Sequence, residues 1–255
     1  MQQLQKWLTV LFLLNLAHSV FSQVVNIEDK RQRLRDTVDW LGSLDISGSW
    51  VKNDKSLMTL RGNLQTEYGR PGQFWLAISQ FNLVKAGDQN FLNDGFQHVR
   101  YNRDIKPWLV WEAFGQAQYN ERARLLFRGL TGTGLRFKLR PILKQRVYFG
   151  MLAMWEYNQL RDTSLIYREP RMSHYLSFNV NLSEKGRLVS TTYWQPLFSD
   201  IQNFRLSSES SLLLPIAKGL QFKSTLTYFY DSDPRLPPAV PNRLSSFLAG
   251  LRYEW

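Results

Sequence analysis

The chain has 255 residues, a formal net charge of +11 and an aromatic content of 14%. It contains no cysteine, which excludes structural disulfides, a thiol nucleophile, cysteine metal sites and a lipid-modified N-terminus. The length suits a single domain. No apolar run after the N-terminal segment approaches the roughly 20 residues that a transmembrane helix needs.

The N-terminal segment has the pattern of a secretory signal peptide. Lys6 supplies the positive charge, Trp7–Leu16 forms the apolar region, and Val20-Phe21-Ser22 offers a cleavage site before Gln23. We therefore expect a cleaved signal peptide over residues 1–22, with a retained membrane anchor as the alternative. Residues 23–39 are rich in charge and are expected to be a short periplasmic lead-in.

From Trp40 onward the chain alternates apolar and polar residues, which is the period of a β-strand. About twelve such runs can be counted, separated by turn residues. They are Trp40–Lys52, Leu57–Tyr68, Phe74–Leu83, Phe96–Arg103, Trp108–Asn120, Leu125–Leu139, Arg146–Asn158, Met172–Leu182, Leu188–Gln195, Phe204–Leu214, Leu220–Tyr230 and Phe247–Trp255.

The connections between these runs alternate in length. Segments such as Gly69–Gly72 and Ser183–Gly186 are short, whereas Val84–Asp94, Gln159–Pro170 and Asp231–Asn242 are long. This layout is typical of bacterial outer-membrane barrels. We therefore predict an all-β fold over residues 40–255, a closed antiparallel transmembrane β-barrel of about twelve strands in the bacterial outer membrane. A soluble secreted β-sandwich is the alternative.

The last run ends the chain on an aromatic residue. Its apolar face carries Phe247, Leu251, Tyr253 and Trp255. A terminal strand of this kind closes a barrel and places aromatic residues at the membrane interface. We expect these four residues to form the signal that the barrel-assembly machinery recognises, after delivery by periplasmic chaperones.

The polar face of the runs predicts a charged, basic lumen. Such a lumen is either filled by mutually paired side chains, leaving a structural or narrow-pore envelope protein, or open as a channel that prefers small anions. About twelve strands fall between the filled and the open barrels, so size leaves both possibilities. The predicted lumen-lining residues are Arg61, Glu67, Arg100, Glu112, Arg128, Arg136, Lys138, Glu156, Arg205, Glu209, Lys223 and Arg252.

A hydrolase site is the remaining alternative, and the sequence offers little for it. The histidines after the signal peptide, His98 and His174, have no serine and acid at a recognisable spacing. We therefore expect no catalytic residue, cofactor or metal, and neither does the sequence indicate a nucleic-acid partner. Asp231 and Asp233 are either a ligand contact or, more simply, turn residues.

Three arginines in the Gln159–Pro170 region and just after it form a further candidate for membrane contact. Arg161, Arg168 and Arg171 either contact anionic lipid head groups or lie in an ordinary solvated loop.

Several short patches resemble one family. They are Arg100-Tyr101-Asn102-Arg103, Trp111-Glu112-Ala113-Phe114-Gly115-Gln116, Arg128-Gly129-Leu130-Thr131-Gly132-Thr133-Gly134-Leu135-Arg136-Phe137, Tyr193-Trp194-Gln195-Pro196 and Tyr228-Phe229-Tyr230-Asp231-Ser232-Asp233-Pro234. Together they are similar to the salt-induced outer-membrane protein family, catalogued as domain of unknown function 481. The resemblance implies an outer-membrane barrel and supplies no established activity or catalytic residue.

Overall fold

The computed structural model describes residues 39–52, 56–87, 89–121, 124–139, 146–161, 166–183, 186–218, 220–236 and 242–253. The predicted signal peptide and all but the last residue of the lead-in lie outside these ranges, as does Trp255. Within them, no helix is long and apolar enough to cross a bilayer.

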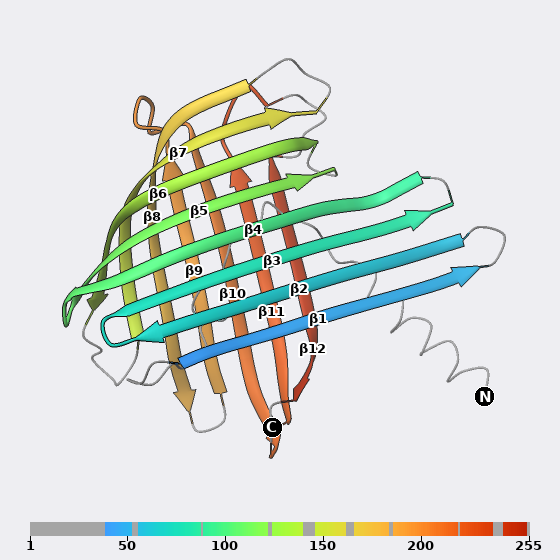
Figure 1. Ribbon diagram of the computed structural model, residues 1–255, viewed down its shortest axis with the longest axis horizontal. Helices are drawn as coiled ribbons and strands as arrows, with labels where there is room; N and C mark the ends of the chain where they lie inside the picture. Colours follow the sequence, from blue (N-terminus) through green and yellow to red (C-terminus); the bar gives the residue numbers. More distant parts are fainter. Residues whose placement is uncertain are drawn as a thin grey trace.

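The described residues form a single antiparallel sheet (Figure 1). Each strand pairs with its neighbours in sequence, in the order β1 to β12, so the predicted all-β antiparallel fold is confirmed. The strands are β1 (Asp39–Lys52), β2 (Ser56–Arg70), β3 (Gln73–Ala86), β4 (Gln89–Lys106), β5 (Leu109–Asn120), β6 (Leu125–Leu139), β7 (Arg146–Leu160), β8 (Ile166–Ser183), β9 (Gly186–Pro196), β10 (Phe204–Ala217), β11 (Leu220–Asp231) and β12 (Arg243–Tyr253).

Two of the predicted long connections are shorter than expected. The segment Val84–Asp94 belongs mostly to β3 and β4, which are joined at Gly87 with a positive φ of 64°. Most of Gln159–Pro170 likewise lies in β7 and β8. Polar residues suggested loops in both places, but backbone pairing between antiparallel strands requires no apolar side chain. We call the end of the sheet that carries the β5–β6, β7–β8, β9–β10 and β11–β12 connections the loop end, and the opposite end the turn end.

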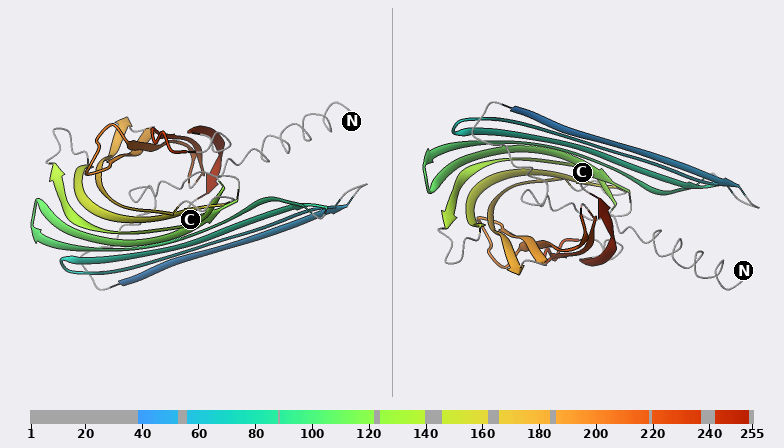
Figure 2. Two further views of the ribbon diagram at one scale, coloured as in Figure 1. Left: turned by 90° about the horizontal axis from the view of Figure 1, so that it is seen from above. Right: turned by 90° about the horizontal axis from the view of Figure 1, so that it is seen from below.

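The sheet is flat at its start and strongly curled in its second half. Figure 2 shows that β1–β4 form an extended part, whereas the following strands curve until β9–β12 lie across from β5–β7. Glycines without side chains allow this curvature on the concave face. A Cβ on Gly134 would lie 2.1 Å from the carbonyl oxygen of Met151, and one on Gly150 would lie 2.0 Å from the ring of Tyr175.

The sheet is open in the described residues, which do not show the expected closure of the barrel. β1 and β12 stand at the two ends of the hydrogen-bonded order. The close-approach glycines of the concave face lie in β6 and β7, while Gly48, Gly62 and Gly95 in β1, β2 and β4 lie on the other face. The first strands therefore lack the local feature that accompanies the curl, and β1 does not reach β12.

The two faces of the sheet have opposite chemistry. The outward, convex face exposes large apolar side chains, including Trp40, Trp50, Trp111, Trp155 and Phe247. The concave face buries polar and charged side chains, and its apolar clusters are small, one formed by Leu76, Ile78 and Phe96 and another by Leu152, Tyr175 and Tyr193. An apolar exterior around a polar interior is the reverse of a soluble domain and is typical of a transmembrane barrel.

Candidate functional site

The first candidate site surrounds Glu112 on the concave face, in the half nearer the turn end. Glu112 of β5 is 0% exposed. Its Oε2 accepts hydrogen bonds from Arg100 Nη1 at 3.1 Å and from the hydroxyl of Tyr175 at 2.6 Å. Its Oε1 accepts from Arg136 Nη1 at 3.4 Å and from the side-chain amide of Asn102. These five residues form what we call the Glu112 cluster, which draws on strands β4, β5, β6 and β8.

Aromatic rings enclose the two arginines of this cluster. The guanidinium of Arg136 lies 3.7 Å from the ring centre of Tyr148, and that of Arg100 lies 5.4 Å from the ring centre of Phe114. Such cation–π contacts are strongest where water is excluded. They favour a fixed position for both guanidinium groups.

The second candidate site surrounds Glu156 of β7, nearer the loop end. Arg205 Nη1 lies 2.6 Å from Glu156 Oε1, Arg171 Nε lies 2.9 Å from Oε2, and Arg128 Nε lies 3.4 Å from Oε1. Arg205 also binds Asp231, with 2.6 Å between Nε and Oδ2. These five residues form the Glu156 cluster. The three arginines come from β6, β8 and β10, so one carboxylate joins three other strands.

A short segment after β11 covers the Glu156 cluster at the loop end, and we call residues 232–236 the strap. Arg235 of the strap binds Asp233 and also Glu169 of β8. Its Nη2 donates a hydrogen bond of 3.1 Å to Glu169 Oε2. Burial opposes ionisation of Asp233, but hydrogen bonds from the side chain and backbone of Arg235 outweigh it and hold the pKa of the Asp233 carboxyl at about 2. The same side-chain hydrogen bonds to Asp233 and Glu169 raise the pKa of the Arg235 guanidinium. The strap is therefore held by charge-assisted hydrogen bonds.

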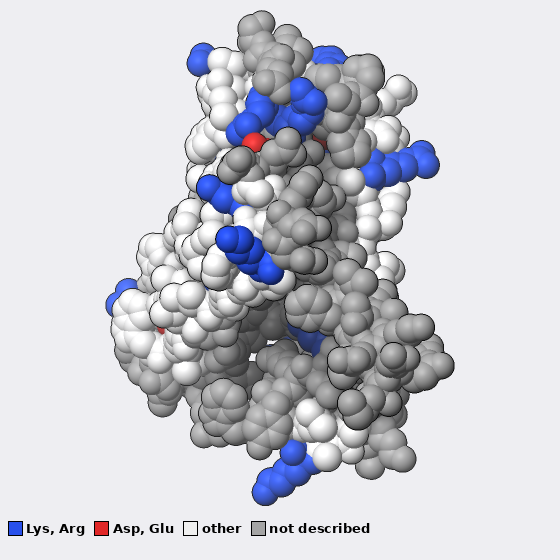
Figure 3. All heavy atoms as spheres, turned by 90° about the vertical axis from the view of Figure 1, so that its right-hand side faces the viewer, with Lys and Arg blue, Asp and Glu red and all other residues white. Residues whose placement is uncertain are grey.

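Positive charge exceeds negative charge by one in each cluster, since the Glu156 cluster has three arginines and the two carboxylates of Glu156 and Asp231. The Glu112 cluster has the cations Arg100 and Arg136 and the anion Glu112. In Figure 3 the described part of the visible face likewise carries many Lys and Arg side chains and few Asp and Glu. Among the described residues, no group of three or more His, Asp or Glu is placed to hold a metal ion.

The structure places the predicted lumen-lining residues in two classes. Glu67, Arg100, Glu112, Arg128, Arg136, Glu156 and Arg205 are buried. The partly exposed residues are Arg61, Lys138, Glu209 and Lys223. Among them, Lys138 at the turn end pairs with Asp104 at 2.9 Å. The side chain of Arg252 lies outside the described part of the chain.

Arg171 corrects one sequence-based expectation. We considered it as an outer lipid contact, but it is 0% exposed and binds Glu156, with its Nη2 also 3.1 Å from Asn203 Oδ1. Arg171 is an even number of positions from Glu169, Ser173 and Tyr175 in β8, so all four side chains lie on the concave face. We missed this pattern in the sequence because we assigned the segment before Arg171 to a loop.

The remaining expected residues have diverse positions. Asp231 binds Arg205, and Asp233 binds Arg235. His98 lies within 3.1 Å of the side chain of Gln116 and stacks near Phe96 and Phe114, which is a packing role. Phe247 lies on the outward face and is 68% exposed. Leu251 and Tyr253 fall in β12 but their side chains are outside the described part.

Comparison with known proteins identifies the family. No curated protein matches the chain. Among solved structures, the NanC porin matches with a TM-score of 0.50 and 12% identity over 84% of this chain and 100% of the porin. The β domain of the Bordetella autotransporter BrkA has a TM-score of 0.35 and 12% identity, over 85% of this chain and 98% of that domain.

At this identity the likeness to the porin concerns the fold alone, and it agrees with the apolar exterior and polar interior described above. The model of the family described as "Protein of unknown function, DUF481" matches residues 45–255. This match covers most of the chain and confirms the resemblance on which the sequence analysis relied. The chain belongs to the DUF481 family.

Proposed function

We propose that the protein is an integral outer-membrane β-barrel whose lumen is closed, or narrowed to a very small pore, by the Glu112 and Glu156 clusters. The observation that carries this proposal is the binding of three arginines from three strands to the fully buried Glu156. A carboxylate placed among guanidinium groups in this way fills the interior instead of lining a water channel. The protein then acts as a structural element of the envelope.

The exposed aromatic residues of the outward face support a location in a bilayer. Trp40, Trp50 and Trp155 are each at least half exposed, at 68%, 69% and 50%. In lipid, the unpaired backbone groups of the β1 and β12 edges would each cost several kcal/mol. The proposal therefore includes pairing of β1 with β12 when the protein is embedded in the membrane.

Single-channel recording in a planar bilayer tests the closed lumen. Purified protein is refolded, and its insertion is verified by heat-modifiable mobility in electrophoresis. Inserted protein should give no discrete current steps, or only very small ones. Large, well-resolved steps would contradict a filled lumen.

An anion-preferring channel is the second candidate, and the excess of positive charge in the Glu112 cluster favours it. A salt gradient across the same bilayer would then give a reversal potential of the sign expected for anions. Arg61, Arg128, Arg136 and Lys223 would be the first residues to replace by glutamine, and their loss should reduce the anion preference.

Assembly of such a barrel requires outer-membrane lipid, periplasmic chaperones and the barrel-assembly machinery, which we propose as partners. The recognition signal would be the strand that carries Phe247, Leu251, Tyr253 and Trp255. Deletion of residues 253–255 should strongly reduce insertion in cells, measured by protease protection and fractionation. Normal insertion of the shortened chain would refute this assignment.

A further inference from the structure

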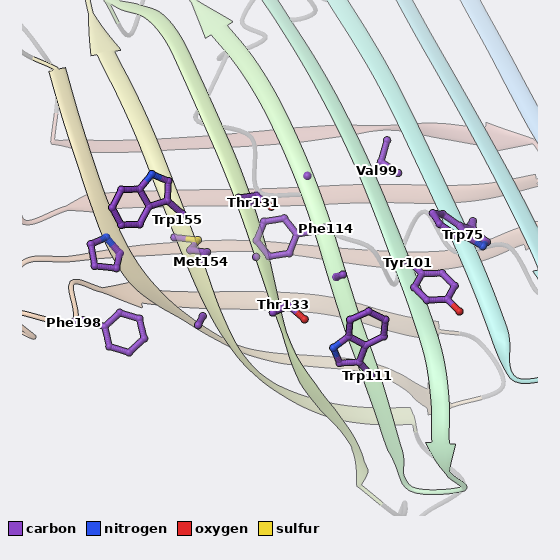
Figure 4. Close-up of a pocket in the computed structure, with 15 residues that line it drawn as sticks. Trp75, Val99, Tyr101, Trp111, Phe114, Thr131, Thr133, Met154, Trp155 and Phe198 are labelled. Atoms are coloured by element: carbon purple, nitrogen blue, oxygen red, sulfur yellow. The ribbon is translucent and has the colours of Figure 1, made fainter.

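A groove of about 740 Å³ crosses the outward face of the sheet (Figure 4). Its floor is made of small residues on β5, β6 and β7, which are Ala113, Gly115, Thr131, Thr133 and Ala153. The volume is in the range of small-molecule binding sites. The groove is separate from both ion-pair clusters, because these lie on the concave face.

Large apolar side chains form the two walls of the groove. Trp75 and Trp111 stand on one side, and Trp155 and Phe198 stand on the other (Figure 4). All four remain between 38% and 50% exposed. Small residues between bulky ones thus leave an elongated depression in an otherwise filled surface.

The floor is apolar although it contains threonines. The hydroxyl of Thr133 donates a hydrogen bond of 2.9 Å to the backbone carbonyl of Glu112, so its polar group is already satisfied. Gly115 opens the floor further, since a Cβ built there meets no atom within 4 Å. An occupant of the groove therefore meets mainly methyl groups and aromatic rings.

A cation lies beside the groove toward the loop end. Pro170 of β8 lines the groove, and Arg168, two positions earlier in β8, lies on the same outward face. Arg168 is exposed, and its guanidinium lies 5.5 Å from the ring centre of Tyr157. The arrangement places an apolar channel below a positive charge, which is complementary to a lipid with an anionic head group.

We propose that the groove binds one acyl chain of a phospholipid whose head group carries a net negative charge, with the lipid phosphate at Arg168. This inference rests on the proposed membrane location. An empty groove in lipid would lose the dispersion contacts of its walls, and a flexible acyl chain restores them. A second copy of the protein fits the groove less well, because the face that it would present is convex.

The experiment uses vesicles of phosphatidylglycerol and phosphatidylcholine in which one lipid at a time carries a photoactivated diazirine in an acyl chain. Insertion is first verified by heat-modifiable mobility, so that failure of the membrane proposal is seen separately. After irradiation, adducts are located by mass spectrometry. Adducts of phosphatidylglycerol should concentrate on β5–β8 and exceed those of phosphatidylcholine.

Two variants sharpen the test. Gly115→Phe, whose Cβ would meet no atom within 4 Å, places a ring on the floor and should remove most adducts at the groove. Gly48→Phe on the outward face of β1 should leave them unchanged. Arg168→Gln should reduce the preference for phosphatidylglycerol about fivefold, which is the worth of one cation near an anionic head group. Equal adducts for both lipids, or adducts spread evenly over all strands, would overturn the proposal.

The mass of the particle in detergent distinguishes the other occupant. If a second copy fills the groove, Gly115→Phe will convert a dimer to a monomer and the lipid adducts at β5–β8 will be absent in the unmodified protein. That result would also overturn the proposal.

Discussion

The hydroxyl of Tyr175 donates a hydrogen bond of 2.6 Å to Oε2 of Glu112, although the two residues are 63 positions apart in the chain. Two strands, β6 and β7, lie between them in the sheet. The contact therefore crosses the concave space instead of following the sheet. It fixes the curvature of the second half of the molecule by joining its two sides.

Replacement of Tyr175 by phenylalanine should destabilise the folded protein by about 2 kcal/mol, since a buried hydrogen bond to a charged group is lost. The free energy of unfolding in urea, measured in detergent or vesicles, tests this value. A double-mutant cycle with Glu112→Gln should show coupling between the two sites. Additive effects of the two substitutions would contradict a direct contact.

Replacement of Glu156 by glutamine leaves Arg128, Arg171 and Arg205 near one another without their shared counter-charge. We expect a loss of about 3–5 kcal/mol, as when one partner of a buried ion pair is removed. Unfolding in urea measures the loss. The matched substitution Glu121→Gln removes a partly exposed pair with Arg161 and should cost less than about 1 kcal/mol. Similar losses in both variants would contradict the central position of Glu156.

Acid should release the strap. The carboxyl of Asp233 has an ordinary pKa of 3.8 and a pKa of about 2 in the folded protein. Because the folded pKa is lower, the contribution of Asp233 to stability is present above about pH 4 and is lost as the pH falls toward 2.

A spin label on the strap measures this release. The chain has no cysteine, so Pro234→Cys gives a single attachment site. The mobility of the label should rise between pH 4 and pH 2, and in a variant that also carries Asp233→Asn it should be high already at pH 7. Asp200→Asn, in the β9–β10 connection, is the control and should keep the original pH dependence. A label that is equally mobile at every pH would refute the strap contacts.

Gly134 is the most restricted of the glycines on the concave face. In Gly134→Ala the new Cβ would meet backbone atoms of Met151 and Leu152, which cannot move aside as a flexible side chain would. We expect a loss of about 1–3 kcal/mol from this overpacking. Gly48→Ala, where the Cβ would have ordinary contacts of 3.6 Å or more, should change the free energy of unfolding by less than about 1 kcal/mol.

The sequence predicted the strands better than their ends. Alternation located β5, β6, β7 and β10 closely, because side chains on the two faces of these strands differ strongly in polarity. It failed between Val84 and Asp94, where polar residues such as Asn90 and Asn93 continue the strand by backbone pairing. It predicted a closed barrel and could not predict the opening between β1 and β12 in the described residues, which depends on curvature and not on the residues of one strand.

The candidate site could be predicted as a set of charges but not as pairs. Alternation placed Arg128, Arg136 and Glu156 on one face, and they are buried there. The grouping of Arg205 with Glu156 joins β10 to β7, and no local pattern reports which strands meet across a curved sheet. The strap contacts of Arg235 were also missed. That residue lies outside every strand, so alternation says nothing about its partners.

The three arginines at Glu156 have a consequence for folding. Side chains of a strand alternate between the two faces, so a shift of one residue in β8 would turn Arg171 toward the convex face and bring Pro170 or Met172 inside. The same shift in β10 would move Arg205 outward, and Asp231 would lose its partner as well. Misaligned pairings of β6, β8 or β10 thus lose ion pairs with Glu156 and are less stable. This single carboxylate therefore helps to select the native register of half the sheet.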